Sequence, residues 1–136
     1  MAYWIVKSEP SVYSFEQLQK DKTTVWDGVK NPAALINLRN MKKGDTVLFY
    51  HSNDSKCIVG TALVSKEAYP DPKSKDPKLV VVELSVGKAL PKIVALAEIK
   101  SNPKLAQLEL VRISRLSVSK LPDTLWKELM KMAREK

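Results

Sequence analysis

The stretch Thr46-Val47-Leu48-Phe49-Tyr50-His51 decides the fold, because β-branched and aromatic residues dominate it and favour an extended strand. Turn-forming side chains follow from Ser52 to Lys56, and an apolar stretch from Cys57 to Lys66 then returns along the first strand. Within this return, Gly60 predicts a bulge or a point of close approach to the backbone. Together the three segments predict an antiparallel β-hairpin.

A strand and a helix are predicted near the N-terminus. The alternation from Tyr3 to Lys7 is typical of a short strand, and a turn follows it. Ser14 can cap a helix from Phe15 to about Lys20. Gln17, three residues after the cap, completes the pattern of a capping box.

The segment between this helix and the hairpin contains a second predicted helix. Asp21 to Thr24 is predicted as a polar linker, and Val25 to Lys30 as an irregular segment. Asn31 can cap the second helix, and Pro32 suits its first turn. The apolar face of that helix comprises Ala34, Leu35, Leu38 and Met41.

The part of the chain after the hairpin begins with a long predicted loop, from Glu67 to Lys78, which is polar and rich in proline. Long loops in compact domains are often functional. Leu79 to Val86 is predicted as a buried strand, Leu90-Pro91 as a turn and Ile93 to Lys100 as a short helix. The last predicted elements are a strand from Leu108 to Ile113 and a helix that begins at Leu121-Pro122-Asp123.

These elements predict one domain that covers residues 1–136. About five mostly antiparallel strands with helices at the periphery indicate an α+β fold, built around a bent sheet or a small barrel.

The composition indicates a class of partner and excludes several other classes. A net charge of +8 and a pI near 9.6 suggest a polyanion such as nucleic acid. No apolar run approaches the roughly 20 residues of a membrane helix, and the first residues lack the pattern of a signal peptide, so no membrane is expected. With one cysteine, Cys57, and one histidine, the chain suits a reducing, cytoplasmic compartment and predicts no metal site and no cofactor. A monomer is the default expectation.

Trp26 is the aromatic residue of greatest interest, because it lies in the segment predicted to be irregular. A large aromatic residue there either fills the core, which is the usual position of tryptophan, or forms a pocket wall. Phe49 and Tyr50 are adjacent on a strand and therefore point to opposite faces.

Polar residues at the ends of two predicted strands are further candidates. Lys7, Ser8 and Glu9 end the first strand, where a lysine can hold a phosphate and the other two can read a base or sugar, although a solvated turn explains them equally well. His51 and Ser52 end the first hairpin strand, and neighbours so close in sequence do not generally assemble a catalytic triad.

Several motifs of this chain resemble those of the EVE domain family, and they occur in the same order along the sequence. The similarity runs from the first strand to the long loop and extends, less distinctively, to the C-terminus. The family usually has arginine where this chain has Lys30, which keeps the charge and loses the bidentate geometry. The motifs are Tyr3-Trp4-Ile5-Val6-Lys7-Ser8-Glu9-Pro10, Val25-Trp26-Asp27-Gly28-Val29-Lys30-Asn31, Lys42-Lys43-Gly44-Asp45-Thr46-Val47-Leu48-Phe49-Tyr50-His51-Ser52, Ile58-Val59-Gly60 and Glu67-Ala68-Tyr69-Pro70-Asp71.

This resemblance implies a fold like that of the PUA superfamily, a bent β-barrel flanked by helices, and a relationship to YTH domains. EVE domains are associated with modified bases, notably modified cytosines such as 5-methylcytosine in DNA, with RNA as another ligand. By motif, Trp26 would be the stacking wall and Tyr69 a second wall. The resemblance also places Lys7 and Ser8 at the pocket floor, Asn31 as a polar reader, and Tyr50, His51 and Ser52 near the rim or base.

Three functions are compatible with these observations. The first is a non-enzymatic reader of a modified nucleobase flipped into an aromatic pocket, with DNA as the expected partner. The second is an RNA-binding or RNA-modification-associated protein, or an enzyme acting on nucleic acid, with His51 or Glu9 as the acid–base group. The third is a protein–protein adaptor whose basic charge is incidental.

Overall fold

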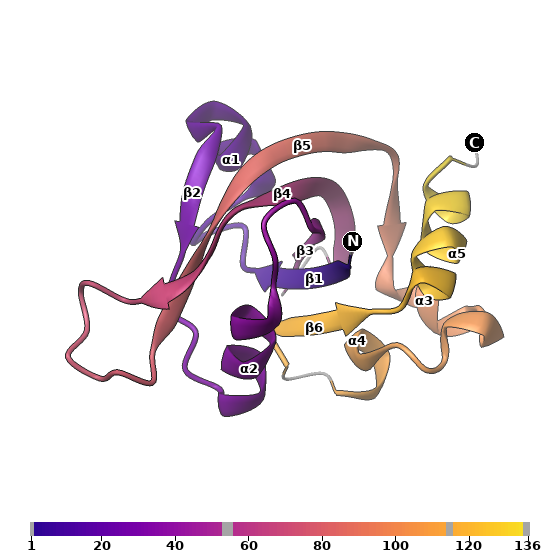
Figure 1. Ribbon diagram of the computed structural model, residues 1–136. Helices are drawn as coiled ribbons and strands as arrows, with labels where there is room; N and C mark the ends of the chain where they lie inside the picture. The colour runs from indigo at the N-terminus through magenta and orange to yellow at the C-terminus, as the bar shows by residue number, and fades with distance from the viewer. Residues whose placement is uncertain (1, 53–55, 114–115, 135–136) are drawn as a thin grey trace.

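The computed structural model describes residues 2–52, 56–113 and 116–134, and it shows an α+β fold built on one six-stranded sheet (Figure 1). The strands are β1 Tyr3–Ser8, β2 Thr23–Trp26, β3 Thr46–His51, β4 Cys57–Pro70, β5 Val80–Ala95 and β6 Val118–Leu121. The α-helices are α1 Phe15–Asp21, α2 Pro32–Asn40, α3 Leu96–Ser101, α4 Glu109–Arg112 and α5 Asp123–Arg134, with a 3₁₀ turn η1 at Pro103–Leu105.

The strand order is β2-β5-β4-β3-β1-β6, and the predicted hairpin of β3 and β4 lies near its middle. Every neighbouring pair is antiparallel except β1 and β3, which run parallel. Figure 1 shows β4 and β5 curving together across the molecule, so the sheet is bent. In the described residues β2 and β6 are separate edges of an open sheet, and the expected closure into a barrel is not confirmed.

The two faces of the sheet carry separate cores because side chains alternate along each strand. On the first face, Trp4 and Val6 of β1 and Phe49 of β3 pack under the apolar residues of α1 and α2. On the second face, Ile5 and Tyr50 pack under α3, η1, α4 and α5. Phe49 and Tyr50 therefore point to opposite faces, as predicted.

Gly60 confirms the predicted close approach. The ring of Phe15, from α1, lies where a Cβ at position 60 would be, so a larger residue would displace that ring. The strand pairing is also irregular on either side of Gly60, which indicates a bulge. Glycine at this position therefore lets the helix that follows β1 pack directly onto β4.

Asp45, a buried residue, fixes the beginning of β1 against the turn before β3. Its carboxylate accepts hydrogen bonds from the Trp4 indole Nε1 at 3.0 Å, from the Lys42 amide at 2.9 Å and from the Ala2 amide at 3.1 Å. Burial raises the pKa of this carboxyl, but the three donors outweigh that effect and hold the pKa below its ordinary value.

Both helices predicted before the hairpin are confirmed, and so are their caps. The Ser14 hydroxyl accepts the Gln17 amide N–H, and the Asn31 side chain accepts those of Ala33 and Ala34. The Ser14–Gln17 bond is half of the predicted capping box, and the Gln17 side-chain amide donates to Asp21. Residues 53–55 of the expected hairpin turn lie outside the described residues.

Two predictions about the middle of the chain are wrong. Residues 23–26, expected in a linker and an irregular segment, form strand β2, which has only β5 as a described neighbour and shows no clear alternation. The predicted loop begins later than expected, because β4 continues to Pro70. The shorter loop is ordered by turns in which Asp71, Ser74 and Asp76 accept backbone N–H groups two residues ahead.

The structure also corrects the predicted turn at Leu90-Pro91, which lies inside β5. The edge strand β2 pairs with β5 only at residues 82–85, so no N–H is needed on that side of position 91. The predicted helix from Ile93 begins at Leu96, after β5 ends.

The predicted strand from Leu108 to Ile113 is wrong. This segment makes the helical turn α4, in which the amide of Arg112 donates to Leu108 and that of Ile113 to Glu109. Alternating apolar residues do not distinguish so short a helix from a strand. The last strand of the sheet is β6, which follows α4 in the chain. The predicted final helix is confirmed as α5.

Candidate functional site

A hollow of about 640 Å³ lies where β1 and β2 end, which is within the size range of small-ligand sites. We call it the Trp26 hollow. Two chain segments form most of its wall, one from each strand and the turn that follows it. Its lining residues are Lys7, Ser8, Glu9, Val12, Tyr13, Thr24, Val25, Trp26, Asp27, Gly28, Val29, Lys30, Lys73 and Ser117.

Trp26 belongs to both the core and the hollow. Only 8% of its surface is exposed, and its ring packs edge-on against Phe49 at 5.5 Å and Tyr13 at 6.3 Å between ring centroids. Its remaining surface lines the hollow. The two interpretations of Trp26 that the sequence left open, core residue and pocket wall, therefore describe different parts of one side chain.

The end of β1 supplies three of the predicted site residues to the hollow: Lys7, Ser8 and Glu9. The ammonium of Lys7 lies 5.9 Å from the centroid of the Tyr50 ring, and burial lowers its pKa. The Ser8 hydroxyl donates to the carbonyl of Tyr13 at 2.6 Å, which closes the turn after the strand. Glu9 is exposed at the hollow. Their role in binding stays a prediction.

Tyr13 is a wall of the hollow that the sequence analysis missed. Its hydroxyl donates to Asp21 at 2.9 Å, and burial together with that carboxylate raises its pKa. The ring is thus held edge-on against Trp26. An aromatic residue immediately before a helix cap and after a turn at a strand end was the signal available in the sequence.

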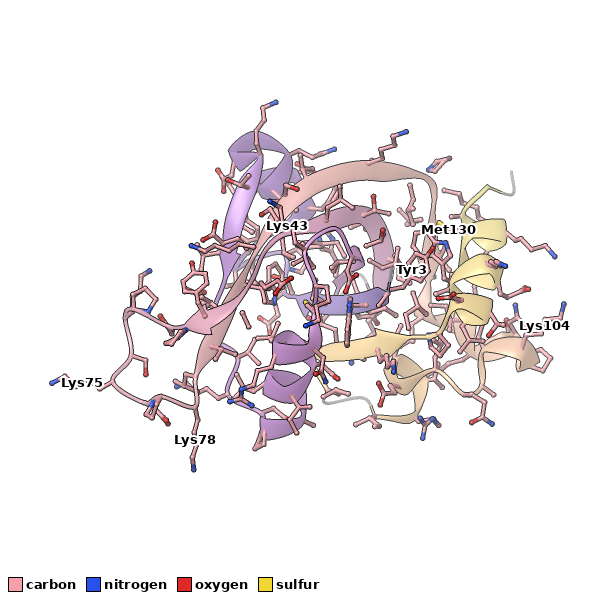
Figure 2. The ribbon with its side chains drawn as sticks, in the orientation of Figure 1. Tyr3, Lys43, Lys75, Lys78, Lys104 and Met130 are labelled. Atoms are coloured by element: carbon pink, nitrogen blue, oxygen red, sulfur yellow. The ribbon has the colours of Figure 1, made fainter. Side chains whose placement is uncertain are left out.

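Cationic side chains line the hollow beside two carboxylates. Lys30 follows β2, and Lys73 reaches in from the β4–β5 loop, where its ammonium lies 3.9 Å from the Asp27 carboxylate. With Lys7 and Glu9 this gives three cations against two anions. Further lysines extend the positive charge along the loop, where Figure 2 shows Lys75 and Lys78 projecting outward.

Five predicted site residues do not line the Trp26 hollow, and Asn31 and Tyr69 are two of them. Asn31 caps α2 through its side-chain oxygen, so that oxygen is already bonded to the helix. Tyr69 lies on β4, where its hydroxyl donates to Glu83 at 2.7 Å and Lys66 lies over its ring. Tyr69 lines a separate shallow hollow with both of these residues.

Tyr50, His51 and Ser52 also do not line the hollow, and they lie at the end of β3, beside β1. Tyr50 is buried on the second face of the sheet, and the Ser52 amide donates to the carbonyl of Ser8 at 2.9 Å. His51 Nε2 accepts the Phe15 amide N–H at 3.0 Å and so caps the beginning of α1. This bond needs the neutral imidazole, and burial lowers the His51 pKa accordingly.

His51 and Cys57 do not form a reactive pair. Cys57 lies opposite His51 in the β3–β4 register, but burial raises the pKa of its thiol, and the acceptor nitrogen of His51 is occupied by α1. Among residues 2–52, 56–113 and 116–134, no three His, Cys, Asp or Glu side chains gather as a metal site would require. None of the helices in those same ranges is long and apolar enough to cross a membrane.

Comparison with known proteins gives matches over nearly the whole chain. The family model of the EVE domain matches residues 2–132. Human thymocyte nuclear protein 1 is 36% identical over an alignment of 126 residues, and the alignment covers 74% of this chain and 56% of the human protein. The chain spans about half the length of the curated relatives it matches.

Solved structures share the fold. The NMR structure of Rpa0253 from Rhodopseudomonas palustris has a TM-score of 0.94 and 41% identity, and the match covers 100% of this chain and 97% of that chain. A crystal structure of human THYN1 protein in complex with DNA containing 5-methylcytosine has a TM-score of 0.92 and 30% identity, with coverage of 100% and 99%.

Proposed function

This chain belongs to the EVE domain family, and from that membership we propose that it reads a modified cytosine, such as 5-methylcytosine, in DNA. The base would leave the stack and enter the Trp26 hollow, and the protein would bind it without changing it. A solved relative of the same fold, human THYN1 protein, was crystallised with DNA that contains this base.

One observation carries the proposal. The Trp26 hollow combines aromatic walls, polar side chains at a strand end and a cationic rim at one place in the fold. A flipped base needs all three, because stacking and edge contacts must offset the few kcal/mol lost on unpairing, and the DNA phosphates need positive charge.

Glu9 has the chemistry to select cytosine. Its carboxylate lines the hollow and is exposed. Carboxylates accept hydrogen bonds from the exocyclic amine of cytosine, whereas thymine has a carbonyl oxygen there that would repel the carboxylate. Thymine also carries a methyl group at C5, so the methyl group alone does not separate it from 5-methylcytosine.

The modification itself should contribute a modest preference. One buried methyl group is worth about 0.8 kcal/mol, or about fourfold in affinity. The test compares the affinity of the protein for oligonucleotides that differ at one position, which holds cytosine, 5-methylcytosine or thymine, at two salt concentrations. We expect 5-methylcytosine to bind about fourfold more tightly than cytosine, and thymine to bind least.

A substitution of Glu9 tests the assignment of the hollow. Glu9→Gln keeps the size of the side chain but provides an amide that can donate to the thymine oxygen, so discrimination against thymine should fall by about tenfold. Glu67→Gln is the matched control, because Glu67 is also exposed but does not line the Trp26 hollow. Equal affinity of the unchanged protein for all three bases would contradict the proposal, and tighter binding to the matching RNA would replace DNA as the partner.

A further inference from the structure

Val12 is an apolar side chain in an unusual position. It is 78% exposed, more than the other large exposed apolar residues in the described part of the chain. It lines the Trp26 hollow, as does Val25, which is 44% exposed, whereas Ile36, Leu63 and Ile93 are exposed away from the hollow. Single exposed apolar residues are common on proteins, so the position of Val12 beside a cationic hollow is what calls for an explanation.

The turn that carries Val12 is held rigidly. The amides of Val12 and Tyr13 both donate to the carbonyl of Glu9 at 2.9 Å, and the Ser8 hydroxyl closes the turn from the other side. The chain enters this turn from the paired strand β1 and leaves it into the capped helix α1. Valine is itself stiff because it is β-branched, so little side-chain entropy would be lost on contact.

We propose that Val12 is a wedge for double-stranded DNA: its side chain enters the base stack at the gap left by the cytosine that occupies the Trp26 hollow. This inference rests on the proposed function and extends it from the flipped base to the duplex that the base leaves. Flipping opens an apolar gap between the neighbouring base pairs, and proteins that deform DNA commonly insert apolar side chains between base steps.

The surroundings of Val12 favour DNA as the occupant of this surface. Lys7, Lys30 and Lys73 line the same hollow and would lie near the phosphates on both sides of the gap. A protein partner would gain little from two exposed valines, Val12 and Val25, beside three lysines. A duplex offers both the negative backbone and a narrow apolar space.

The experiment separates the wedge from the reader by comparing duplex and single-stranded DNA of one sequence with a single 5-methylcytosine. A single strand has no gap to fill, so only the duplex should depend on Val12. We expect Val12→Ser to weaken duplex binding about tenfold and to leave single-strand binding unchanged. Val12→Leu, which remains apolar, should retain duplex binding.

Ile36→Ser is the matched control, because Ile36 is 55% exposed on α2 and does not line the hollow. It should change neither affinity. Both positions are exposed, so thermal unfolding should show nearly unchanged stability for both variants. A fluorescent base analogue opposite the modified cytosine should report unstacking with the unchanged protein and less of it with Val12→Ser.

The outcomes distinguish the two proposals. Suppose that the unchanged protein prefers the modified base. If Val12→Ser then weakens the binding of duplex and single-stranded DNA equally, or weakens neither, Val12 is not a wedge, and the proposal that the protein reads the modified base is unaffected. Binding of the single strand alone also overturns the wedge. If the unchanged protein shows no preference for the modified base in either form, the proposed function fails, and the wedge fails with it.

Discussion

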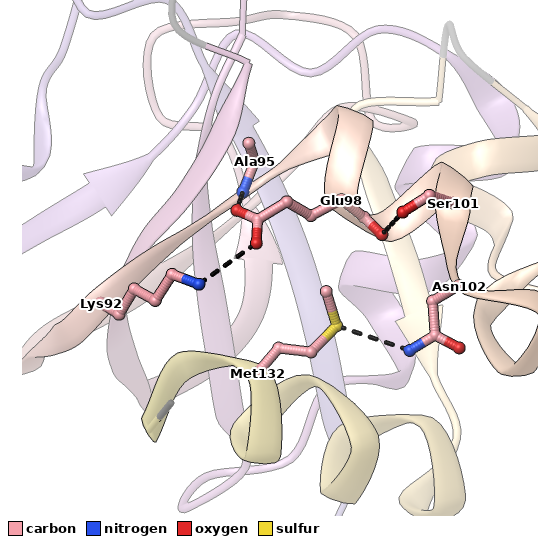
Figure 3. Close-up of polar contacts among 6 residues, drawn as sticks. All are labelled: Lys92, Ala95, Glu98, Ser101, Asn102 and Met132. Atoms are coloured by element: carbon pink, nitrogen blue, oxygen red, sulfur yellow. Dashed lines mark hydrogen bonds and ion pairs between the residues drawn. The ribbon is translucent and has the colours of Figure 1, made fainter. Parts of the chain in front are cut away.

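The two faces of the sheet differ in what their polar side chains contact. On the second face, the polar groups around α3 and α5 bond to one another (Figure 3). At the end of β1, Lys7 and Glu9 instead line the open Trp26 hollow. The polar groups around α3 and α5 are satisfied by contacts within the protein, whereas those at the end of β1 line an open hollow.

Glu98 is the centre of the closed region. Its carboxylate accepts the Ala95 amide N–H at 3.2 Å and receives the Lys92 ammonium at 3.3 Å. The Asn102 side chain, after α3, donates to Glu128 at 2.9 Å and contacts the sulfur of Met132 at 3.7 Å, which ties α3 to α5. Substitutions on this face should therefore change stability and leave DNA binding by the folded protein intact.

Trp26 and Leu129 provide the largest expected effect and the sharpest comparison. Both are buried, Trp26 on the first face and Leu129 in α5 on the second. We expect Trp26→Ala and Leu129→Ala each to lower the free energy of unfolding by about 2–5 kcal/mol, because both leave a cavity. Chemical denaturation measures this loss.

The two variants should differ once the folded protein is isolated. At low temperature and without denaturant, Leu129→Ala should keep the affinity for 5-methylcytosine DNA, whereas Trp26→Ala should lose it. Trp26→Phe keeps an aromatic ring at the same place and should recover part of both stability and binding. Equal loss of affinity in Trp26→Ala and Leu129→Ala would show that the two faces are not functionally distinct.

The sequence predicts this contrast only in part. The β3–β4 hairpin, the capped helices α1 and α2 and the strand-end residues Lys7 to Glu9 follow from local patterns, which the structure confirms as elements. Short edge strands do not, because β2 and β6 each have four residues and depend on pairing with distant strands.

The candidate site could also be predicted from the sequence only in part. Trp26 and the end of β1 could be selected from the sequence, but their meeting with Tyr13 and Lys73 depends on how β2 pairs with β5 and on where the β4–β5 loop returns. The sequence predicts Tyr69 as a site residue only from its position in a predicted loop. The continuation of β4 placed it at another hollow, which no local pattern indicated.

The pH dependence of stability should separate the two faces by a smaller effect. The pKa of His51 is lowered from its ordinary 6.5, so the neutral imidazole that caps α1 contributes fully above pH 6.5, and its contribution is lost as the pH falls below that value. One such hydrogen bond is worth about 0.5–1.5 kcal/mol. His51→Gln, which provides an uncharged acceptor, should abolish this loss of stability at low pH.

The contribution of Glu98, on the second face, to stability should change at a lower pH than that of His51. The Ala95 amide, followed by Lys92, lowers its pKa from the ordinary 4.5, so its contribution is present above that value and is lost only as the pH falls below it. Unfolding measured from pH 8 to pH 3 should show that Glu98→Gln is less stable than the unchanged protein above pH 4.5 and that this difference disappears below that value. The loss of stability below pH 6.5 should be absent only in His51→Gln. If Glu98→Gln abolished the loss of stability near pH 6, this assignment would be contradicted.

The smallest effect concerns single lysines at opposite ends of the molecule, Lys75 in the β4–β5 loop and Lys104 in η1 (Figure 2). Lys75→Ala and Lys104→Ala remove the same charge, but only Lys75 lies in the loop that brings Lys73 to the hollow. If that loop follows the DNA backbone, Lys75→Ala should reduce the slope of log affinity against log salt by about 1, and Lys104→Ala should leave it unchanged. Equal slopes for the two variants would mean that net charge, rather than the face that carries the hollow, attracts the DNA.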